Sequence, residues 1–183
     1  MLEQISRGLY RLAKLPVVLI CLLVFLIFSA TQLPAQSSQA AAYSADAGTP
    51  DTSFFYTPAE LNRMAERFGS SGRQAYIRAR FTFDLVFPLV YGAFLATSLS
   101  FLLGRSLDEA SPWRRLNLIP LAAVLLDLLE NASAALVMAV YPAPQPLAAA
   151  LAALATPLKW LFVGGSFALL PPAAWMSLRK HDS

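Results

Sequence analysis

Four long stretches of this sequence contain no Asp, Glu, Lys or Arg, and they constrain the fold more than any other feature. They are residues 15–45, 85–104, 131–158 and 160–178. A helix that crosses the hydrocarbon core of a bilayer needs about 20 mainly apolar residues, and each stretch approaches or exceeds that length. The sequence therefore predicts an all-α integral membrane four-helix bundle that forms one transmembrane domain over residues 1–183.

The composition narrows the function classes further. Charged residues make up 14% of the chain, compared with about 25% in soluble proteins, so a soluble enzyme and a nucleic-acid binder are disfavoured. Cys21 is the only cysteine and His181, near the end, the only histidine, which leaves no disulfide, no thiolate cluster and no imidazole within the spans. We expect no metal, no cofactor and no nucleic-acid partner.

The boundaries of the spans follow from the apolar runs and from the residues that break them. We predict spans at about residues 15–33, 81–103, 116–141 and 147–170. The prolines of residues 142–146 are expected to end the third span, and Pro171 and Pro172 the fourth, because proline disrupts a helix interior. A basic helix that starts near Ser71 is expected to run directly into the second span.

The insertion between the first two spans, residues 34–78, is expected to lie outside the cytoplasm. Residues 34–56 are rich in Ala, Ser, Gln, Thr and Pro without an apolar period, so they read as an extended linker. Thr57 and Glu60 form a capping-box pattern and Gly69 supplies a stop. These signals predict a short amphipathic helix over residues 58–68, either on the membrane surface or bundle mouth, or packed against a neighbouring helix.

The distribution of cations predicts the orientation. Three Lys and Arg residues precede the first span, three lie in residues 104–115 and two lie in the tail, and short cytoplasmic loops carry such an excess. Both termini are therefore expected in the cytoplasm, with the protein in a bacterial inner membrane. The first span also resembles a secretory signal peptide, but we expect an uncleaved anchor.

Ionisable residues inside spans are costly, so each one is a functional hypothesis by default. Here they are Asp84, Asp127, Glu130 and Lys159. At the rise of a helix, Asp84 lies about 5 Å below the outer ends of the spans, Glu130 and Asn131 about 15–17 Å, Lys159 about 18 Å and Asp127 about 21 Å. Three spans thus direct polar groups towards the outer half of the bundle.

Helical spacing groups these residues into one predicted pocket. Asp127, Glu130 and Asn131 share one face of their span, and Tyr91 falls at about the depth of Glu130. Lys159 is expected to pair with Glu130, which leaves Asp127 as the least compensated acid. Pro88 and Pro157 would free backbone carbonyls near this level, which favours a cavity. The predicted ligand-binding residues are Asp84, Tyr91, Asp127, Glu130, Asn131 and Lys159.

Several functions remain open for this polar set. The first hypothesis is a pocket that binds a lipid or another amphipathic ligand, with an enzyme variant in which Asp127 and Glu130 serve as acid and base. The same residues could instead fix helix register, or grip partner helices in an accessory subunit of a membrane complex. Ion or proton translocation ranks third, because the inner half of the second span offers only Thr97, Ser98 and Ser100.

Overall fold

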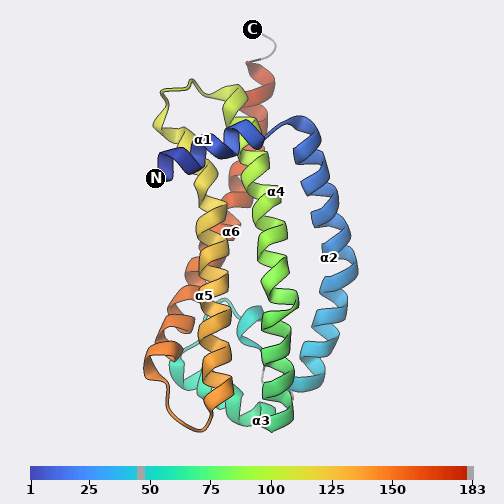
Figure 1. Ribbon diagram of the computed structural model, residues 1–183, viewed down its shortest axis with the longest axis vertical. Coiled ribbons are helices and arrows are strands. Elements are labelled where there is room, and N and C mark those ends of the chain that lie inside the picture. The colour runs from blue at the N-terminus through green and yellow to red at the C-terminus, as the bar shows by residue number, and fades with distance from the viewer. Residues whose placement is uncertain (45–47, 181–183) are drawn as a thin grey trace.

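The computed structural model of the chain describes residues 1–44 and 48–180. His181 lies outside these residues. The described elements, all helical, are α1 (Leu2–Leu12), α2 (Leu15–Ser44), η1 (Pro50–Thr52), α3 (Pro58–Phe81), α4 (Phe83–Ser106), η2 (Pro112–Leu118), α5 (Ile119–Val140) and α6 (Pro146–Arg179). Four helical segments are long and apolar enough to cross a membrane. The predicted all-α four-helix bundle is confirmed (Figure 1).

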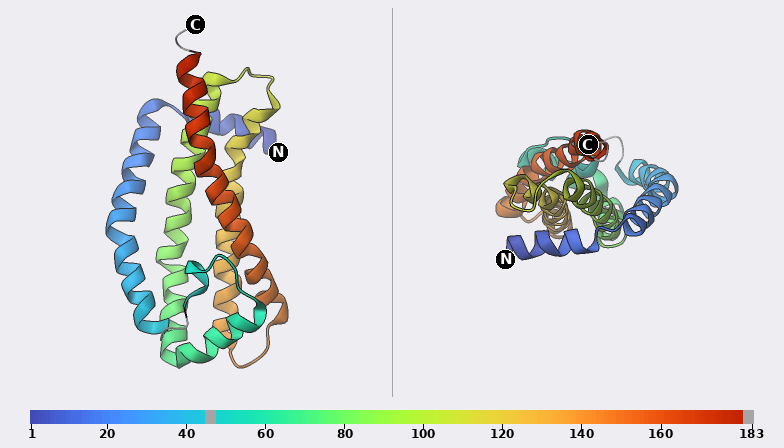
Figure 2. Two further views of the ribbon diagram at one scale, coloured as in Figure 1. Left: turned by 180° about the vertical axis from the view of Figure 1, so that it is seen from behind. Right: turned by 90° about the horizontal axis from the view of Figure 1, so that it is seen from above.

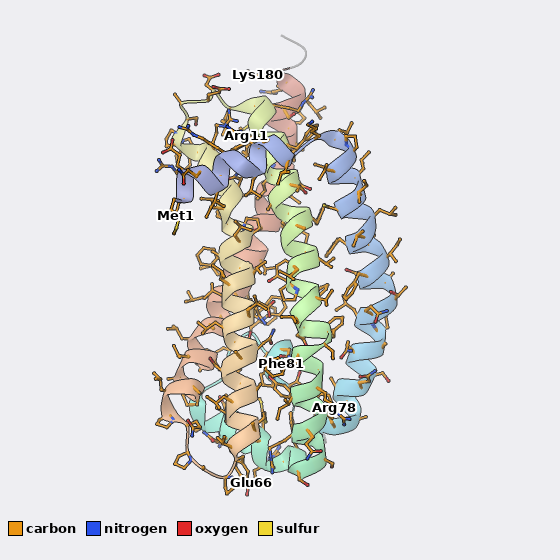
Figure 3. All side chains as sticks on the ribbon, viewed as in Figure 1. Met1, Arg11, Glu66, Arg78, Phe81 and Lys180 are labelled. Carbon is orange, nitrogen blue, oxygen red and sulfur yellow. The ribbon has the colours of Figure 1, made fainter. Side chains whose placement is uncertain are left out.

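The four long helices form a bundle with α1 across one end and α3 across the other (Figures 1 and 2). Both described chain ends lie at the α1 end, where Figure 3 labels Met1 and Lys180. Small residues bring helices close together in membrane proteins, and α5 and α6 meet through buried alanines such as Ala134 and Ala149. Gly92 lets α4 approach α5 closely, because a Cβ at that position would collide with Val124 of α5.

Helix α1 is an element that the sequence analysis does not predict. It lies across the bundle end and is held by polar contacts (Figure 2). Ser6 Oγ donates to Asn117 Oδ1 at 2.8 Å, and Tyr10 Oη donates to the Arg114 carbonyl oxygen at 2.7 Å. The helix has three turns and no long apolar run, so the alternation of apolar and polar residues at helical spacing is the sequence signal that could have predicted it.

Helix α2 corrects the prediction of a linker from residue 34, because the helix continues to Ser44 with Pro34 inside it. Its far end packs against α3, where the Tyr43 ring lies 5.6 Å from that of Phe68 and 6.2 Å from that of Tyr76. Ala and Gln are good helix formers, and these aromatic contacts supply the stabilisation that local sequence lacks. The linker prediction is therefore wrong for residues 34–44.

Helix α3 begins as predicted. The Glu60 amide donates to Thr57 Oγ1 at 3.2 Å, and the Thr57 amide donates to Glu60 Oε2 at 2.7 Å, which completes the capping box. The predicted stop is present as a break, since Gly69 has a φ of 62° that favours glycine. The buried face of the first half includes Leu61 and Phe68, so this helix both covers the bundle mouth and packs against its neighbours.

Two other helix boundaries differ from the prediction. Thr82, with φ −117° and ψ −84°, separates α3 from α4, so the basic helix does not run directly into the second span. Helix α6 continues through Pro171 and Pro172 to Arg179. Proline removes hydrogen bonds from a helix but can keep helical φ, and transmembrane helices tolerate it when neighbouring groups satisfy the freed carbonyls.

Candidate functional site

A cavity of about 450 Å³ lies between the long helices near the α3 end of the bundle. Helices α2, α4, α5 and α6 supply its walls, and residues 49–54 cover it. One part of its lining is aromatic or aliphatic and the other is polar. The residues used below are Phe25, Asp51, Phe54, Arg80, Phe83, Asp84, Phe87, Tyr91, Asp127, Asn131, Lys159, Trp160, Val163 and Phe167.

Asp127 of α5 lies at the centre of the polar part and has more partners than predicted. Tyr91 Oη donates to its Oδ2 at 3.0 Å, and Asn131 Nδ2 donates to its Oδ1 at 3.1 Å. Asn131 Nδ2 also donates to the Asp84 carbonyl oxygen at 3.2 Å, the carbonyl that Pro88 frees. The prediction that Asp127 is the least compensated acid is corrected for hydrogen bonds, because Tyr91 donates from the facing α4 and Asn131 donates from the next turn of α5.

The predicted pair of Lys159 and Glu130 is present. Lys159 Nζ lies 2.5 Å from Glu130 Oε2, whereas its distance to Asp127 Oδ1 is 3.8 Å. Glu130 is fully buried, and Thr156 Oγ1 donates to its Oε1 at 2.7 Å. A buried carboxylate needs such compensation, so Glu130 is the main partner of the Lys159 ammonium.

Tyr56, from the segment before α3, reaches the same carboxylate from the other side. Its Oη donates to Glu130 Oε1 at 3.5 Å, and the residue is buried. Burial and the negative charge of Glu130 raise the pKa of Tyr56 above its ordinary value. The phenol therefore keeps its proton at neutral pH and remains a donor to Glu130.

A second ion cluster closes the α3 end of the cavity around Arg80. The side chain is 5% exposed, and its guanidinium bridges Asp51 and Asp84, with 2.8 Å between Arg80 Nη2 and Asp84 Oδ2. The guanidinium carbon also lies 4.4 Å from the centre of the Tyr76 ring. Arginine suits this position because its planar fork can bind two carboxylates at once.

The segment over the cavity is fastened to α6 by a tryptophan. Trp160 Nε1 donates to the Ser53 carbonyl oxygen at 3.1 Å, and the Trp160 and Phe54 rings lie 5.2 Å apart. Phe54 and Phe55 are largely exposed, at 73% and 68%. The segment over the cavity therefore presents two apolar rings at the protein surface.

Comparisons with known proteins find no relative. No protein-family model, no curated protein and no solved structure matches this chain. The function is therefore inferred from the chemistry of the cavity.

The structure brings together the six residues predicted from the sequence. Asp84, Tyr91, Asp127, Asn131 and Lys159 line the cavity, whereas Glu130 lies behind Lys159 and is not in the lining. The arrangement offers carboxylate acceptors, an ammonium and a guanidinium beside aromatic walls. Chemically it can hold a polar head group while apolar atoms contact the rings.

Sequence reasoning misses several residues of this site. Arg80 and Asp84 are four residues apart, a spacing typical of helix neighbours that could have indicated their pairing. Thr156 lies three residues before Lys159 on the same helix face, which is a weaker signal. Asp51, which lines the cavity, and Tyr56, which contacts Glu130, carry no local signal, because both come from a segment without helical periodicity.

Proposed function

We propose that this membrane protein binds an amphipathic lipid, with the polar head group in the cavity and a hydrocarbon chain between α2, α4 and α6. The proposal is supported mainly by the lining of the cavity, in which the charged Asp127 and Lys159 lie together with the apolar rings of Phe25 and Phe167. Its volume of about 450 Å³ is typical of small-molecule sites. A molecule with one polar end and one apolar end satisfies both parts of this lining.

An apolar groove supports a path for the hydrocarbon chain. It has a volume of about 420 Å³ and lies nearer the α1 end. The groove is lined by Val18, Ser98, Phe101, Leu102, Leu170, Pro171 and Ala174. Val18 lies seven residues before the cavity residue Phe25 on α2, and Ser98 lies seven residues after Tyr91 on α4. Residues seven apart share a helix face, so groove and cavity follow one another along the same faces.

The length of this path suits a lipid chain. Lys159 and Ala174 are 15 residues apart on α6, which corresponds to about 22 Å at the rise of an α-helix. One leaflet contributes about 15 Å of hydrocarbon to a bilayer. The path therefore has room for a head group near Lys159 and one hydrocarbon chain beyond it.

Translocation of ions or protons receives less support. Thr97 Oγ1 donates to the Ala93 carbonyl oxygen at 2.7 Å, and Ser100 Oγ accepts from Asn117 Nδ2 at 3.0 Å. These hydroxyls are engaged within the α1 half of the bundle, where Leu99 and Leu103 form a buried apolar cluster. A polar path would have to cross that cluster.

Filling the cavity should expel the lipid. We expect Val163→Trp to reduce the lipid that copurifies with the full chain in mild detergent by about tenfold or more, because the indole would occupy the cavity that the proposed ligand needs. The measurement is mass spectrometry of the solvent extract together with native mass spectrometry of the protein.

Leu161→Trp is the matched control, since Leu161 is 68% exposed on the same helix. Equal retention by both variants would mean that the lipid is bound at the protein surface, and the proposal would fail. A stoichiometric protein partner without a bound lipid would instead support an accessory subunit of a membrane complex.

We further propose that the α1 end faces the cytoplasm of a bacterial inner membrane. Cations gather there in α1, at the end of α4, in η2 and at the end of α6, and Figure 3 labels Arg11 and Lys180 at this end. In a Cys21→Ala background, we expect Ser71→Cys to react with an impermeant maleimide applied to intact spheroplasts and Ala110→Cys to be protected. Both positions are exposed, so the reverse pattern would overturn this orientation.

A further inference from the structure

We infer that the head group bound in this cavity carries a positive charge, as a protonated amine does. This inference rests on the proposed lipid-binding function and adds the chemical class of the ligand. It follows from the charges around the cavity and from the hydrogen-bonding groups that remain for a ligand.

Carboxylates outnumber cations among the described residues of the site. Asp51, Asp84 and Asp127 line the cavity together with Arg80 and Lys159. The fully buried Glu130 lies behind Lys159 and forms an ion pair with it, with 2.5 Å between Lys159 Nζ and Glu130 Oε2. Two cations therefore serve four carboxylates.

The distances indicate where the uncompensated charge lies. Lys159 Nζ is 3.8 Å from Asp127 Oδ1, well beyond its distance to Glu130. Arg80 is shared by Asp51 and Asp84. Asp127 thus has the hydrogen bonds of Tyr91 and Asn131, but it shares the Lys159 ammonium with Glu130, to which that ammonium lies closer. A ligand cation beside Asp127 would supply the missing charge, and uncompensated charge is costly where water is excluded.

The remaining hydrogen-bonding capacity favours the same ligand. The Tyr91 hydroxyl donates to Asp127, the Asn131 amide donates to Asp127 and to the Asp84 carbonyl oxygen, and the closest contact of the Lys159 ammonium is to Glu130. What the site offers a ligand is mainly acceptor oxygen, and an ammonium carries three donors and no acceptor. A carboxylate or phosphate head group would meet the acids at close range and be repelled.

Aromatic rings complete the environment of a cation. The rings of Phe87 and Tyr91 lie 5.6 Å apart on α4, and Trp160 of α6 lines the same cavity, with Lys159 Nζ 5.2 Å from its ring centre. The faces of such rings attract cations through their quadrupole. They also provide apolar contact for the methylene groups next to an amine.

Three amphiphiles with the same chain test this inference: tetradecylamine, tetradecanol and tetradecanoic acid. The chain has three tryptophans, so Trp113→Phe with Trp175→Phe leaves Trp160, in the cavity wall, as the fluorescent reporter. Titration of the full chain in a neutral detergent should give a Kd for the amine about tenfold below that for the alcohol, with the acid weakest.

Removing a single carboxylate should then reduce the preference. Asp127→Asn keeps an acceptor for Tyr91 and should bring the affinities for amine and alcohol to within about threefold of each other. Asp108→Asn is the matched control, because Asp108 is exposed in the loop after α4, at the far end of the bundle. If Asp127→Asn does not fold, Asp51→Asn at the cavity rim provides the same test.

The outcomes separate the charge inference from the proposed function. Equal binding of amine and alcohol, or preference for the acid, would overturn a cationic head group while leaving a lipid pocket. An amine preference that survives both Asp127→Asn and Asp51→Asn would also overturn it. If none of the three binds and Val163→Trp retains as much lipid as the parent protein, the lipid-binding function itself is wrong.

Discussion

Lys159→Met should destabilise the protein more than the double change Lys159→Met with Glu130→Gln. Among the described residues, the single change leaves the fully buried Glu130 carboxylate with the hydroxyls of Thr156 and Tyr56 as its remaining partners. Breaking a buried ion pair on one side costs about 3–5 kcal/mol, whereas removing both charges avoids most of that penalty. The measurements are folding yield and the midpoint of thermal unfolding in mild detergent.

The two single variants should differ in a defined order. Glu130→Gln leaves Lys159 with Asp127 at 3.8 Å, a carboxylate that a flexible lysine side chain can approach. No such alternative cation is close to Glu130 among the described contacts after Lys159→Met. Glu130→Gln should therefore be the milder change, and Lys180→Met, at an exposed pair, should have little effect.

Two results would change this interpretation. A double variant no better than the worse single variant would mean that Lys159 and Glu130 are not energetic partners, and that Asp127 is the main partner of Lys159. A double variant that folds normally yet loses its lipid would assign the pair to ligand binding. Normal folding with normal lipid retention would leave the pair as a contact that fixes helix register.

Arg80→Met should also be severely destabilising. Arg80 is buried between Asp51 and Asp84, so its loss leaves two carboxylates without their cation, at a cost of about 3–5 kcal/mol. Arg80→Lys should recover only part of that loss, because an ammonium lacks the planar fork that binds two carboxylates. The thermal midpoint in mild detergent measures both effects.

Matched variants identify the cause of the Arg80 effect. Arg78→Met removes an exposed cation two residues earlier on the same helix and should change stability by about 0.5 kcal/mol or less. Adding Asp84→Asn to Arg80→Met should restore part of the lost stability, because one uncompensated carboxylate is removed. If Arg78→Met is as harmful as Arg80→Met, the ion cluster does not account for the effect.

The membrane fold could be predicted from local sequence because the bilayer imposes a local requirement. Backbone groups in hydrocarbon must be satisfied within the segment, so a long apolar run without charges predicts a helix by itself. The capping box at Thr57 and the break at Gly69 are equally local, and both are present. The pairing of Glu130 with Lys159 was predictable because depth along a straight helix can be counted in residues.

Where local signals are weak, packing decided the helix boundaries. The sequence after residue 34 has no apolar period, yet α2 extends to Ser44, where Tyr43 packs against both Phe68 and Tyr76 of α3. Pro171 and Pro172 suggest a helix end, but α6 continues past them. At the end of α2, contacts between distant segments outweigh propensity differences of a few tenths of a kcal/mol per residue. Beyond Pro171 and Pro172, Ala173 is buried in the cluster with Leu99 and Leu103.

The sequence by itself determined that the chain forms apolar helices, which residues lie at similar depth, and that polar side chains accumulate in one half. Only the tertiary structure decided which polar groups meet: Arg80 with Asp51, Asn131 with the Asp84 carbonyl, and Thr156 with Glu130. Depth is fixed by the rise of each helix alone. Hydrogen bonds and ion pairs also depend on how each helix is rotated against its neighbours, and that rotation is set by side-chain packing across the whole bundle.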